Sequence, residues 1–411
     1  METYRYIIIG GGLAGGLAAA NLRQVDAEDS LILITAEPHL PYSRPPLSKA
    51  YLQGKKERQK VLYKPENFYR ENDIEVAQGV AATGLDPAGR TVTLDDGRRL
   101  QYGKLLLATG GSARCLPLPG NDLDNVFTLR TLEDADRIRQ AGGRGRQAVV
   151  MGGSFIGSEV AMSLAELGTR VTMIFPESRL MERIMPPAMS DYLGDMYTVH
   201  GVRLLPGTTA RRLEGEGVLE RVVLDDGVVL EADLCVMGVG IELNTGLARE
   251  AGLALNGEGA VLVDEYLRSS DPDIYAAGDI AAWNDLTFQR RLRVEHWDVA
   301  RNTGARAGRN MAGEHEPYTE LPYFFSDMFD LSLEVWGSLD RWDETVQRGS
   351  LDEGSFAFYY FDEGQLTGVL AVDRPDDERA PMQDLVRRRP MADDVAAVLA
   401  DPAVNLDSLL E

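Results

Sequence analysis

The chain has 411 residues, which predicts two to four domains, and its hydrophobic share of 44% can fill several cores. Its 42 basic and 65 acidic residues give a net charge of −23, which argues against nucleic acid or an anionic membrane surface as a partner. Cys115 and Cys235 belong to no C-x-x-C pair, which excludes a disulfide framework, a metal cluster and a dithiol redox centre. Both cysteines fit a reduced, cytoplasmic setting, and because no apolar run reaches about 18 residues, no spanning helix is expected.

In chain order, two stretches repeat the same succession of elements. Each has an apolar strand, a glycine-rich turn, a helix, a hairpin with Asp-Gly at its turn, and a buried strand that ends in glycine. The corresponding segments are 6–15, 94–97 and 105–111 in the first repeat, and 148–157, 224–227 and 234–240 in the second. The repetition predicts two related α/β halves.

The pattern changes after residue 241. Residues 271–279 predict a turn, a short strand and a glycine stop, and residues 296–312 predict a helix with many small side chains. From about residue 321 the sequence is aromatic and typical of strands, with Gly364 closing a hairpin. A last helix is expected from about Met391 to Leu399, so the C-terminal part is predicted to be a small α+β domain.

The first glycine-rich turn has the pattern Gly10-x-Gly12-x-x-Gly15 between a strand and a helix. Such a turn lets the backbone approach a pyrophosphate at the helix N-terminus. Glu37 follows about 20 residues later, after the strand predicted over 31–35, where an acid accepts hydrogen bonds from ribose hydroxyls. We therefore predict a dinucleotide site; the alternative is a glycine-rich turn in an ordinary α/β domain.

The second turn has the pattern Gly152-x-Ser154-x-x-Gly157, with serine in place of the middle glycine. Glu177 follows the strand predicted over 170–175, and a carboxylate at that ribose repels the 2′-phosphate of NADPH. NADH is therefore favoured over NADPH, although Arg179 could offset the repulsion. The alternative for Glu177 is a solvated loop acid.

Several further motifs in order along the chain carry a family resemblance. Together with the two turns, Arg44-Pro-Pro-Leu-Ser-Lys49, Ala108-Thr-Gly110, Ala277-Gly-Asp279 and Val294-Glu-His-Trp297 resemble the FAD-dependent ferredoxin reductases of oxygenase systems, the putidaredoxin reductase-like family. Phe175-Pro-Glu177, Arg293-Val-Glu-His296 and Phe324-Phe-Ser-Asp327 are closer to apoptosis-inducing factor of the same group. The resemblance covers nearly the whole chain.

The resemblance implies a fold similar to glutathione reductase, with two Rossmann-type domains and a small α+β C-terminal domain. The FAD-binding domain would comprise residues 1–113 and 242–318, and the NAD(H)-binding domain residues 114–241. Residues 319–411 would form the C-terminal interface domain.

The resemblance also implies roles for three candidate catalytic residues. Lys49 would lie near flavin N5, paired with Glu159 on the first turn of the second helix, and would stabilise the anionic reduced flavin. Glu159 would also hold the nicotinamide carboxamide, and Trp297 would shield the flavin or guide the nicotinamide. The alternatives are an exposed lysine after a Pro-Pro turn and, for Glu159, an acid placed by the helix dipole.

The full set of expected cofactor-binding residues lies in both repeats and in the segments after them, and no metal site is expected. Phe325 stands where relatives often carry tryptophan, and His296 could be an ordinary loop histidine. The expected residues are Gly10, Gly12, Leu13, Ala14, Gly15, Glu37, Arg44, Lys49, Val80, Ala108, Thr109, Gly110, Arg114, Gly152, Ser154, Phe155, Ile156, Gly157, Glu159, Glu177, Gly240, Gly278, Asp279, Glu295, His296, Trp297 and Phe325.

The leading hypothesis is a flavoprotein oxidoreductase that passes electrons from NADH through FAD to a one-electron carrier, such as a ferredoxin. Because ferredoxins are usually acidic, docking would need a basic patch, for which Arg290, Arg291 and Arg293 or the run 387–389 are candidates; the alternative for such a run is a solvated helix. Two other hypotheses remain open: a slow NADH-responsive redox sensor similar to apoptosis-inducing factor, and an NADH:quinone or oxygen reductase. The sequence leaves open whether the chain is a monomer or a homodimer.

Overall fold

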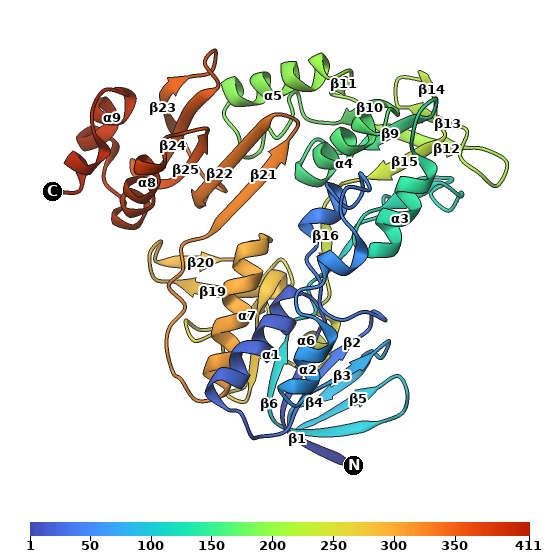
Figure 1. Cartoon of the computed structure of the whole chain (residues 1–411), viewed down its shortest axis with the longest axis vertical. Coiled ribbons are helices and arrows are strands. Elements are labelled where there is room, and N and C mark those ends of the chain that lie inside the picture. Colours follow the sequence, from blue (N-terminus) through green and yellow to red (C-terminus); the bar gives the residue numbers. More distant parts are fainter. The chain divides into compact units, whose positions relative to one another are not determined.

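The computed structural model describes residues 1–411, and the chain folds into two compact units, each assembled from three segments (Figure 1). Unit 1 contains residues 1–43, 58–112 and 242–322. Unit 2 contains residues 44–57, 113–241 and 323–411.

Unit 1 is built around a seven-stranded sheet with the order β3-β2-β1-β6-β5-β4, in which β18 also pairs with β6. Its central strands are parallel, and Ile8 of β1 pairs with Leu33 of β2 and Leu106 of β6. These strands are buried on both faces, which explains why they are continuous apolar runs. The Asp-Gly hairpin is confirmed between β5 and β6, where Gly97 has a φ of +88°. The strands are β1 (Glu2–Ile9), β2 (Leu31–Thr35), β3 (Ile74–Gln78), β4 (Ala82–Asp86), β5 (Thr91–Leu94), β6 (Arg99–Leu107) and β18 (Ile274–Ala276).

Two helices far apart in the sequence, α1 (Leu13–Val25) and α7 (Trp297–Met311), lie side by side in unit 1 (Figure 1). A Cβ atom at Gly304 or Gly308 of α7 would collide with the backbone of Ala14 or Ala18 of α1. The two helices can therefore approach closely only because these positions lack a side chain. The helix expected over residues 296–312 is confirmed by α7.

The remaining elements of unit 1 are short, and a three-stranded sheet with the order β17-β19-β20 is the largest of them. They are η2 (Arg58–Val61), α2 (Glu66–Glu71), α6 (Gly246–Glu250), β17 (Val261–Leu262), η3 (Gly278–Ile280), β19 (Ala281–Asp285) and β20 (Arg290–Leu292). β7 (Gly111–Ala113) and β16 (Ile241–Leu243) form a separate two-stranded sheet.

Asp273, which precedes β18, is expected to give unit 1 an acid-sensitive contribution to stability. Its carboxylate forms one ion pair with Lys104, at 2.6 Å, and a second one with Arg90. Burial raises the pKa of Asp273, but the hydrogen bonds and charges of Lys104 and Arg90 outweigh burial, so the pKa lies below its ordinary value. A carboxyl whose pKa is lowered by folding stabilises the protein above its unfolded pKa, and this stabilisation is lost as the pH falls through the folded-state pKa.

We therefore expect Asp273→Asn to be less stable than the natural chain near neutral pH, and the difference to shrink on acidification. Thermal denaturation of both proteins over a pH series measures it. If the stability difference between the two proteins stayed constant down to the lowest pH, the Asp273 carboxylate would not be the source of the acid-sensitive stability.

Unit 2 contains a second α/β half around a parallel sheet with the order β11-β10-β9-β15-β8. The strand expected over residues 170–175 is found as β10, and the second Asp-Gly hairpin is confirmed between β13 and β14, where Gly227 has a φ of +89°. Its elements are η1 (Pro45–Ser48), β8 (Val126–Thr128), α3 (Leu132–Ala141), β9 (Gln147–Met151), α4 (Phe155–Glu166), β10 (Arg170–Phe175), α5 (Pro187–Val199), β11 (Arg203–Pro206), β12 (Ala210–Glu214), β13 (Arg221–Leu224), β14 (Val229–Glu231) and β15 (Leu234–Met237).

The C-terminal part of unit 2 is an antiparallel sheet with the order β21-β22-β25-β24-β23 and two helices. Gly364, with a φ of +76°, lies in the turn between β24 and β25 as expected. The last helix is also confirmed, so the fold class predicted from the sequence holds, whereas the division into three domains stays a prediction. The elements are β21 (Tyr323–Met328), β22 (Leu331–Gly337), β23 (Glu344–Ser350), β24 (Ser355–Asp362), β25 (Gln365–Val372), α8 (Asp376–Arg388), α9 (Ala392–Ala400) and η4 (Leu406–Leu409).

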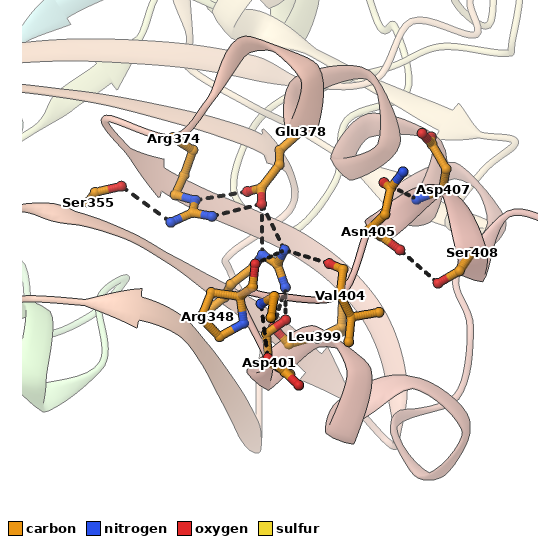
Figure 2. A network of polar contacts seen from close by, with 12 residues as sticks. Arg348, Ser355, Arg374, Glu378, Leu399, Asp401, Val404, Asn405, Asp407 and Ser408 are labelled. Carbon is orange, nitrogen blue, oxygen red and sulfur yellow. Dashed lines mark hydrogen bonds and ion pairs between the residues drawn. The ribbon is translucent and has the colours of Figure 1, made fainter.

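A buried arginine fastens the end of the chain to this sheet. Arg348 of β23 is 1% exposed, and its guanidinium donates to Glu378 of α8 at 2.8 and 3.0 Å (Figure 2). It also donates to the backbone carbonyls of Asp401 at 2.6 Å and Val404 at 2.9 Å. Burial raises the pKa of Glu378, but hydrogen bonds from Arg374 and Arg348 outweigh burial and leave it below its ordinary value.

Candidate functional site

The first glycine-rich turn lies between β1 and α1 in unit 1. Gly10 has a φ of +122°, and a Cβ atom there would collide with the carbonyl oxygen of Ala108. A Cβ at Gly15 would collide with the carbonyl oxygen of Gly10, so α1 packs directly on the turn. A Cβ at Gly12, in contrast, would meet no protein atom within 4 Å. The turn therefore presents open backbone at the N-terminus of α1, where Leu13 and Ala14 begin the helix.

Glu37 lies two residues beyond β2, at the carboxyl end of that strand. The hydroxyl of Tyr42 donates to its Oε2 at 2.5 Å, which orients the carboxylate. The backbone N–H of Val80 donates to the carbonyl of Thr35 at 3.0 Å and so places Val80 beside the same strand end. Both expected contacts therefore lie at the edge of the sheet that carries the glycine turn.

The segments 108–110 and 278–279 extend the same edge. Residues 108–110 follow β6, and residues 278–279 follow β18, which pairs in parallel with β6. Thr109 donates its hydroxyl to the carbonyl of Asn244 at 2.6 Å, and the N–H of Gly278 donates to the hydroxyl of Thr303 at 3.0 Å. The carboxyl ends of β1, β2, β6 and β18 thus bring the expected residues together, and this is the edge where open parallel sheets bind ligands.

The expected residues Glu295, His296 and Trp297 lie at the start of α7 in unit 1. Glu295 forms a 2.5 Å ion pair with Arg293. Burial lowers the pKa of His296 to about 4, so its ring is neutral at physiological pH. The indole N–H of Trp297 is buried without a hydrogen-bond partner. Because buried indole N–H groups are normally paired, this donor is available to a ligand.

The second glycine-rich turn lies between β9 and α4 in unit 2 and repeats the geometry of the first. Gly152 has a φ of +110°, and a Cβ there would collide with the carbonyl oxygen of Gly238. A Cβ at Gly157 would collide with the carbonyl oxygen of Gly152. Ser154 is the exposed N-cap of α4, and its side chain makes no capping hydrogen bond. Phe155 and Ile156 follow as the first residues of the helix, and Ile156 is 43% exposed.

Glu177 lies two residues beyond β10, after the carboxyl end of that strand. Its carboxylate forms a 2.7 Å ion pair with the highly exposed Arg183. Arg179, which could have neutralised a nucleotide phosphate here, instead pairs with Asp191 at 2.7 Å.

Lys49 and Glu159 form an ion pair within unit 2, as the sequence predicts. The ammonium of Lys49 lies 3.1 Å from Oε1 of Glu159, and the two side chains are 13% and 8% exposed. Ser326 donates to the same Oε1 at 2.7 Å, and Ser48 donates to Oε2. The carboxylate is therefore buried, and three donors compensate for its burial.

One expected detail is wrong: Glu159 is the fifth residue of α4, and the first turn of that helix contains no acid. Contacts with Ser48, Lys49 and Ser326, rather than the helix dipole, hold its charge. Ser48 and Ser326 are not among the predicted site residues, although both lie inside motifs that carry the resemblance.

Three more of the expected residues in unit 2 are Phe325, Arg44 and Arg114. Phe325 is 39% exposed, and the ammonium of Lys49 lies 5.4 Å from the centre of its ring. Arg44 donates to the carbonyl of Arg130. Arg114 is exposed, and its backbone N–H donates to the carbonyl of Gly240 at 2.9 Å.

The two candidate basic patches differ in how their charges are used. In the first, Arg291 donates to the carbonyls of Val263 and Ala282, and Arg293 pairs with Glu258 and Glu295. Its arginines therefore serve largely to hold unit 1 together. In the second, residues 387 and 388 form the last turn of α8, which matches the alternative of arginines on a solvated helix.

Both turns fit a dinucleotide on structural grounds. In each, the first glycine carries a positive φ and the third lets the helix pack on the turn, as a phosphate-binding turn requires. No group of three or more His, Cys, Asp or Glu side chains could hold a metal ion. None of the helices combines the length and hydropathy needed to cross a membrane.

Comparisons with known proteins agree with this geometry. Residues 4–304 match the family model described as pyridine nucleotide-disulphide oxidoreductase, and residues 323–410 match the model described as reductase C-terminal. A 5,5′-dehydrodivanillate O-demethylase ferredoxin reductase subunit from Sphingobium sp. is 35% identical over 414 residues, which covers 100% of this chain and 98% of that protein. Human apoptosis-inducing factor 3 is 34% identical over 371 residues, which covers 89% of this chain and 60% of that protein.

A solved structure of a covalent complex between putidaredoxin reductase and putidaredoxin also matches, with a TM-score of 0.93 and 30% identity, over 100% of this chain and 98% of that one. Two family models, a relative and a solved structure that are each matched over 98% of their length, and the two glycine turns thus agree. The chain belongs to the pyridine nucleotide-disulphide oxidoreductase family, within the ferredoxin reductase group that includes relatives of apoptosis-inducing factor, and is an FAD-dependent oxidoreductase that uses NAD(H).

Proposed function

We propose that the chain is an NADH:ferredoxin reductase, which passes electrons from NADH through FAD to a one-electron carrier such as a ferredoxin. The observation that carries the proposal is the presence of a dinucleotide-binding turn in each unit of a chain whose full-length relatives are named ferredoxin reductases. The cysteines support it, because Cys115 and the buried Cys235 are both free. Burial raises the pKa of Cys235 to about 12, so this thiol is not a reactive redox group.

We propose that the residues gathered around each turn bind one dinucleotide. Gly10, Gly12, Gly15, Glu37 and Asp279 bind FAD, as do the segments that follow β6 and β18. FAD supplies the change from two-electron to one-electron transfer when it is bound. Lys49 stabilises negative charge on the reduced cofactor, because its ammonium is buried beside a compensated carboxylate.

On the NAD(H) side, the turn 152–157 binds the pyrophosphate, and Glu159 accepts a hydrogen bond from the nicotinamide carboxamide. Gly240 has a φ of +94° and open space at its Cβ position, which leaves room for the nicotinamide.

We propose that NADH, rather than NADPH, is the donor. The carboxylate of Glu177 repels a 2′-phosphate and accepts hydrogen bonds from the ribose hydroxyls of NADH. Arg179 is held by Asp191, which leaves Arg183 as the only arginine paired with Glu177.

Replacing Glu177 by serine is expected to reverse part of this preference. With the carboxylate removed, Arg183 loses its partner and becomes available to a 2′-phosphate. We expect the ratio of kcat/KM for NADPH to that for NADH to rise about tenfold or more, because bonds to charged groups are worth about 1.5–3 kcal/mol. Anaerobic flavin reduction by each nucleotide measures the ratio. Glu216→Ser makes the same charge change in an exposed loop of unit 2 and should leave the ratio unaltered.

Anaerobic stopped-flow spectroscopy tests the proposed function directly. The purified holoprotein is mixed with NADH, and candidate ferredoxins are then added. Rapid bleaching of the flavin followed by reoxidation within about a second, a normal turnover rate for an enzyme, supports the reductase. Flavin that is reduced by NADH but that no ferredoxin reoxidises would contradict it.

A second candidate function is an NADH-responsive redox sensor, which the similarity to apoptosis-inducing factor 3 favours. In that case a long-wavelength charge-transfer band between reduced flavin and NAD⁺ should persist for minutes after mixing. A change of oligomeric state on reduction, measured by analytical ultracentrifugation, would accompany it.

A further inference from the structure

One face of α4 packs along the edge strand β21 in unit 2. The ring of Phe155 contacts Phe324 edge-on, with 4.9 Å between the ring centres. One turn further along α4, Glu159 accepts the hydrogen bond from Ser326, and a turn beyond that the sulfur of Met162 accepts from the backbone N–H of Phe329 at 2.9 Å. The spacing of these helix residues is that of a single stripe, i, i+4 and i+7.

Ser326, paired with the charged Glu159, lies between the contacts that Phe155 and Met162 make along this seam. It is 1% exposed, and its hydroxyl donates its proton to Oε1 of Glu159 at 2.7 Å. A buried hydroxyl is costly unless it is hydrogen-bonded, and an alanine would fill the seam at no such cost. Contact with the Glu159 carboxylate therefore explains why a serine, rather than an alanine, stands at position 326.

The donors around Glu159 are divided unequally between its two oxygens. An ionised carboxylate offers about four acceptor sites, two on each oxygen. Oε1 accepts from both Lys49 and Ser326, whereas Oε2 accepts only from Ser48. Ser48 is itself held by α4, because the hydroxyl of Ser163 donates to its carbonyl at 2.6 Å and Gln53 donates to Ser163 at 3.0 Å. One acceptor site, on Oε2, stays open.

We propose that Ser326 is a positioning residue: it saturates Oε1 of Glu159, so that Oε2 is the oxygen presented to the amide N–H of the nicotinamide. The inference rests on the proposed role of Glu159 in binding the carboxamide. Without the serine, Oε1 regains an open acceptor site. The carboxylate can then rotate about χ3, an angle that has a broad distribution in glutamate. The C-terminal sheet thus contributes to nicotinamide binding without touching the nucleotide.

The test is the affinity of the oxidised holoprotein for NAD⁺ and for ADP-ribose, a ligand that lacks the nicotinamide. We expect Ser326→Ala to raise the Kd for NAD⁺ about threefold to tenfold, the loss expected when one oriented hydrogen bond to a charged group is weakened. The Kd for ADP-ribose should stay unchanged, because the turn 152–157 and Glu177 are untouched. Isothermal titration calorimetry gives both constants under one condition.

Two further variants separate positioning from general damage. Ser190→Ala removes a hydroxyl that is equally buried, at 1% exposure, but that has no hydrogen-bond partner, so neither Kd should change. In a Glu159→Gln background the effect of Ser326→Ala on NAD⁺ should disappear, because the serine acts only through this side chain.

The outcomes distinguish a failure of the proposed NAD(H) function from a failure of the positioning role of Ser326. A natural chain that binds neither ligand overturns the proposed NAD(H) function itself. A natural chain that binds both, with a Ser326→Ala variant that binds NAD⁺ equally well or loses both ligands in parallel, overturns the positioning role and leaves the proposed function intact.

Discussion

Replacing Gly12 by alanine is expected to yield a folded protein that binds FAD more weakly and purifies with less of it. A Cβ at this position meets no protein atom within 4 Å, and the residue has an ordinary φ of −76°, so the fold itself has no need of glycine there. The methyl group would instead occupy the space through which the pyrophosphate approaches the N-terminus of α1.

Overpacking of this kind costs about 1–3 kcal/mol, which corresponds to roughly tenfold to hundredfold weaker FAD binding. The ratio of flavin to protein absorbance after purification, followed by reconstitution titrations of the apoprotein, measures the loss. Circular dichroism of the apoprotein should show an unchanged melting temperature, which distinguishes a lost ligand contact from a lost fold.

Two glycine variants in unit 1 serve as controls. Gly246→Ala places a methyl group in open space at the start of α6, so both stability and FAD content should be kept. Gly10→Ala should lower the melting temperature of the apoprotein as well, because Gly10 has a positive φ and its Cβ would strike the carbonyl of Ala108. A Gly12→Ala protein that binds FAD as tightly as the natural chain would show that the pyrophosphate does not bind at this turn.

The contrast between Gly10 and Gly12 shows what the sequence can establish about this site. A strand, three spaced glycines and a following helix are local features, and the buried strands that carry them are continuous apolar runs. For this reason the strands over 31–35 and 170–175 have the predicted bounds, and both turns have the predicted geometry. Local pattern was also sufficient for α7, whose small residues are needed for its contact with α1.

The surroundings of Glu159 could not be predicted in the same way. Ser48 and Ser326 stand 111 and 167 residues away from it in the chain, and they meet it only because η1 and β21 both pack on α4. Serine at a single position carries no periodic signal, so only the tertiary structure identifies its role. Helix α8 was expected only as the alternative explanation of its arginine run, and Pro381 inside it weakens the helix pattern of the sequence.

Removing the guanidinium of Arg348 is expected to be the most damaging single change in the C-terminal sheet. Arg348 is 1% exposed, and it connects β23 to α8 through Glu378 and to the last residues of the chain through the carbonyls of 399, 401, 402 and 404 (Figure 2). Arg348→Ala would remove one donor from each of those carbonyls, although Asp401 would keep the backbone N–H of Val404, and it would open a cavity at the same place.

Breaking a buried charge network by removing one partner costs about 3–5 kcal/mol. Glu378 would keep Arg374, which donates to it at 2.7 and 2.8 Å, so the damage should fall mainly on the chain end rather than on α8. We expect the free energy of opening of the segment after α9 to fall by most of that amount. Hydrogen–deuterium exchange of this segment measures it, because exchange reports local opening.

Arg379→Ala is the matched control, since the same substitution on α8 removes a guanidinium that is 43% exposed and pairs with Glu334 and Asp376. Exposed ion pairs contribute about 0–1 kcal/mol, so exchange after α9 should hardly change. Arg348→Lys should lie between the two, because an ammonium keeps the charge but cannot reach the carboxylate and several carbonyls at once with a planar fork. Equal exchange in the Arg348→Ala and Arg379→Ala proteins would mean that the chain end is held by the packing of α8 and α9, and that the hydrogen bonds of Arg348 add little.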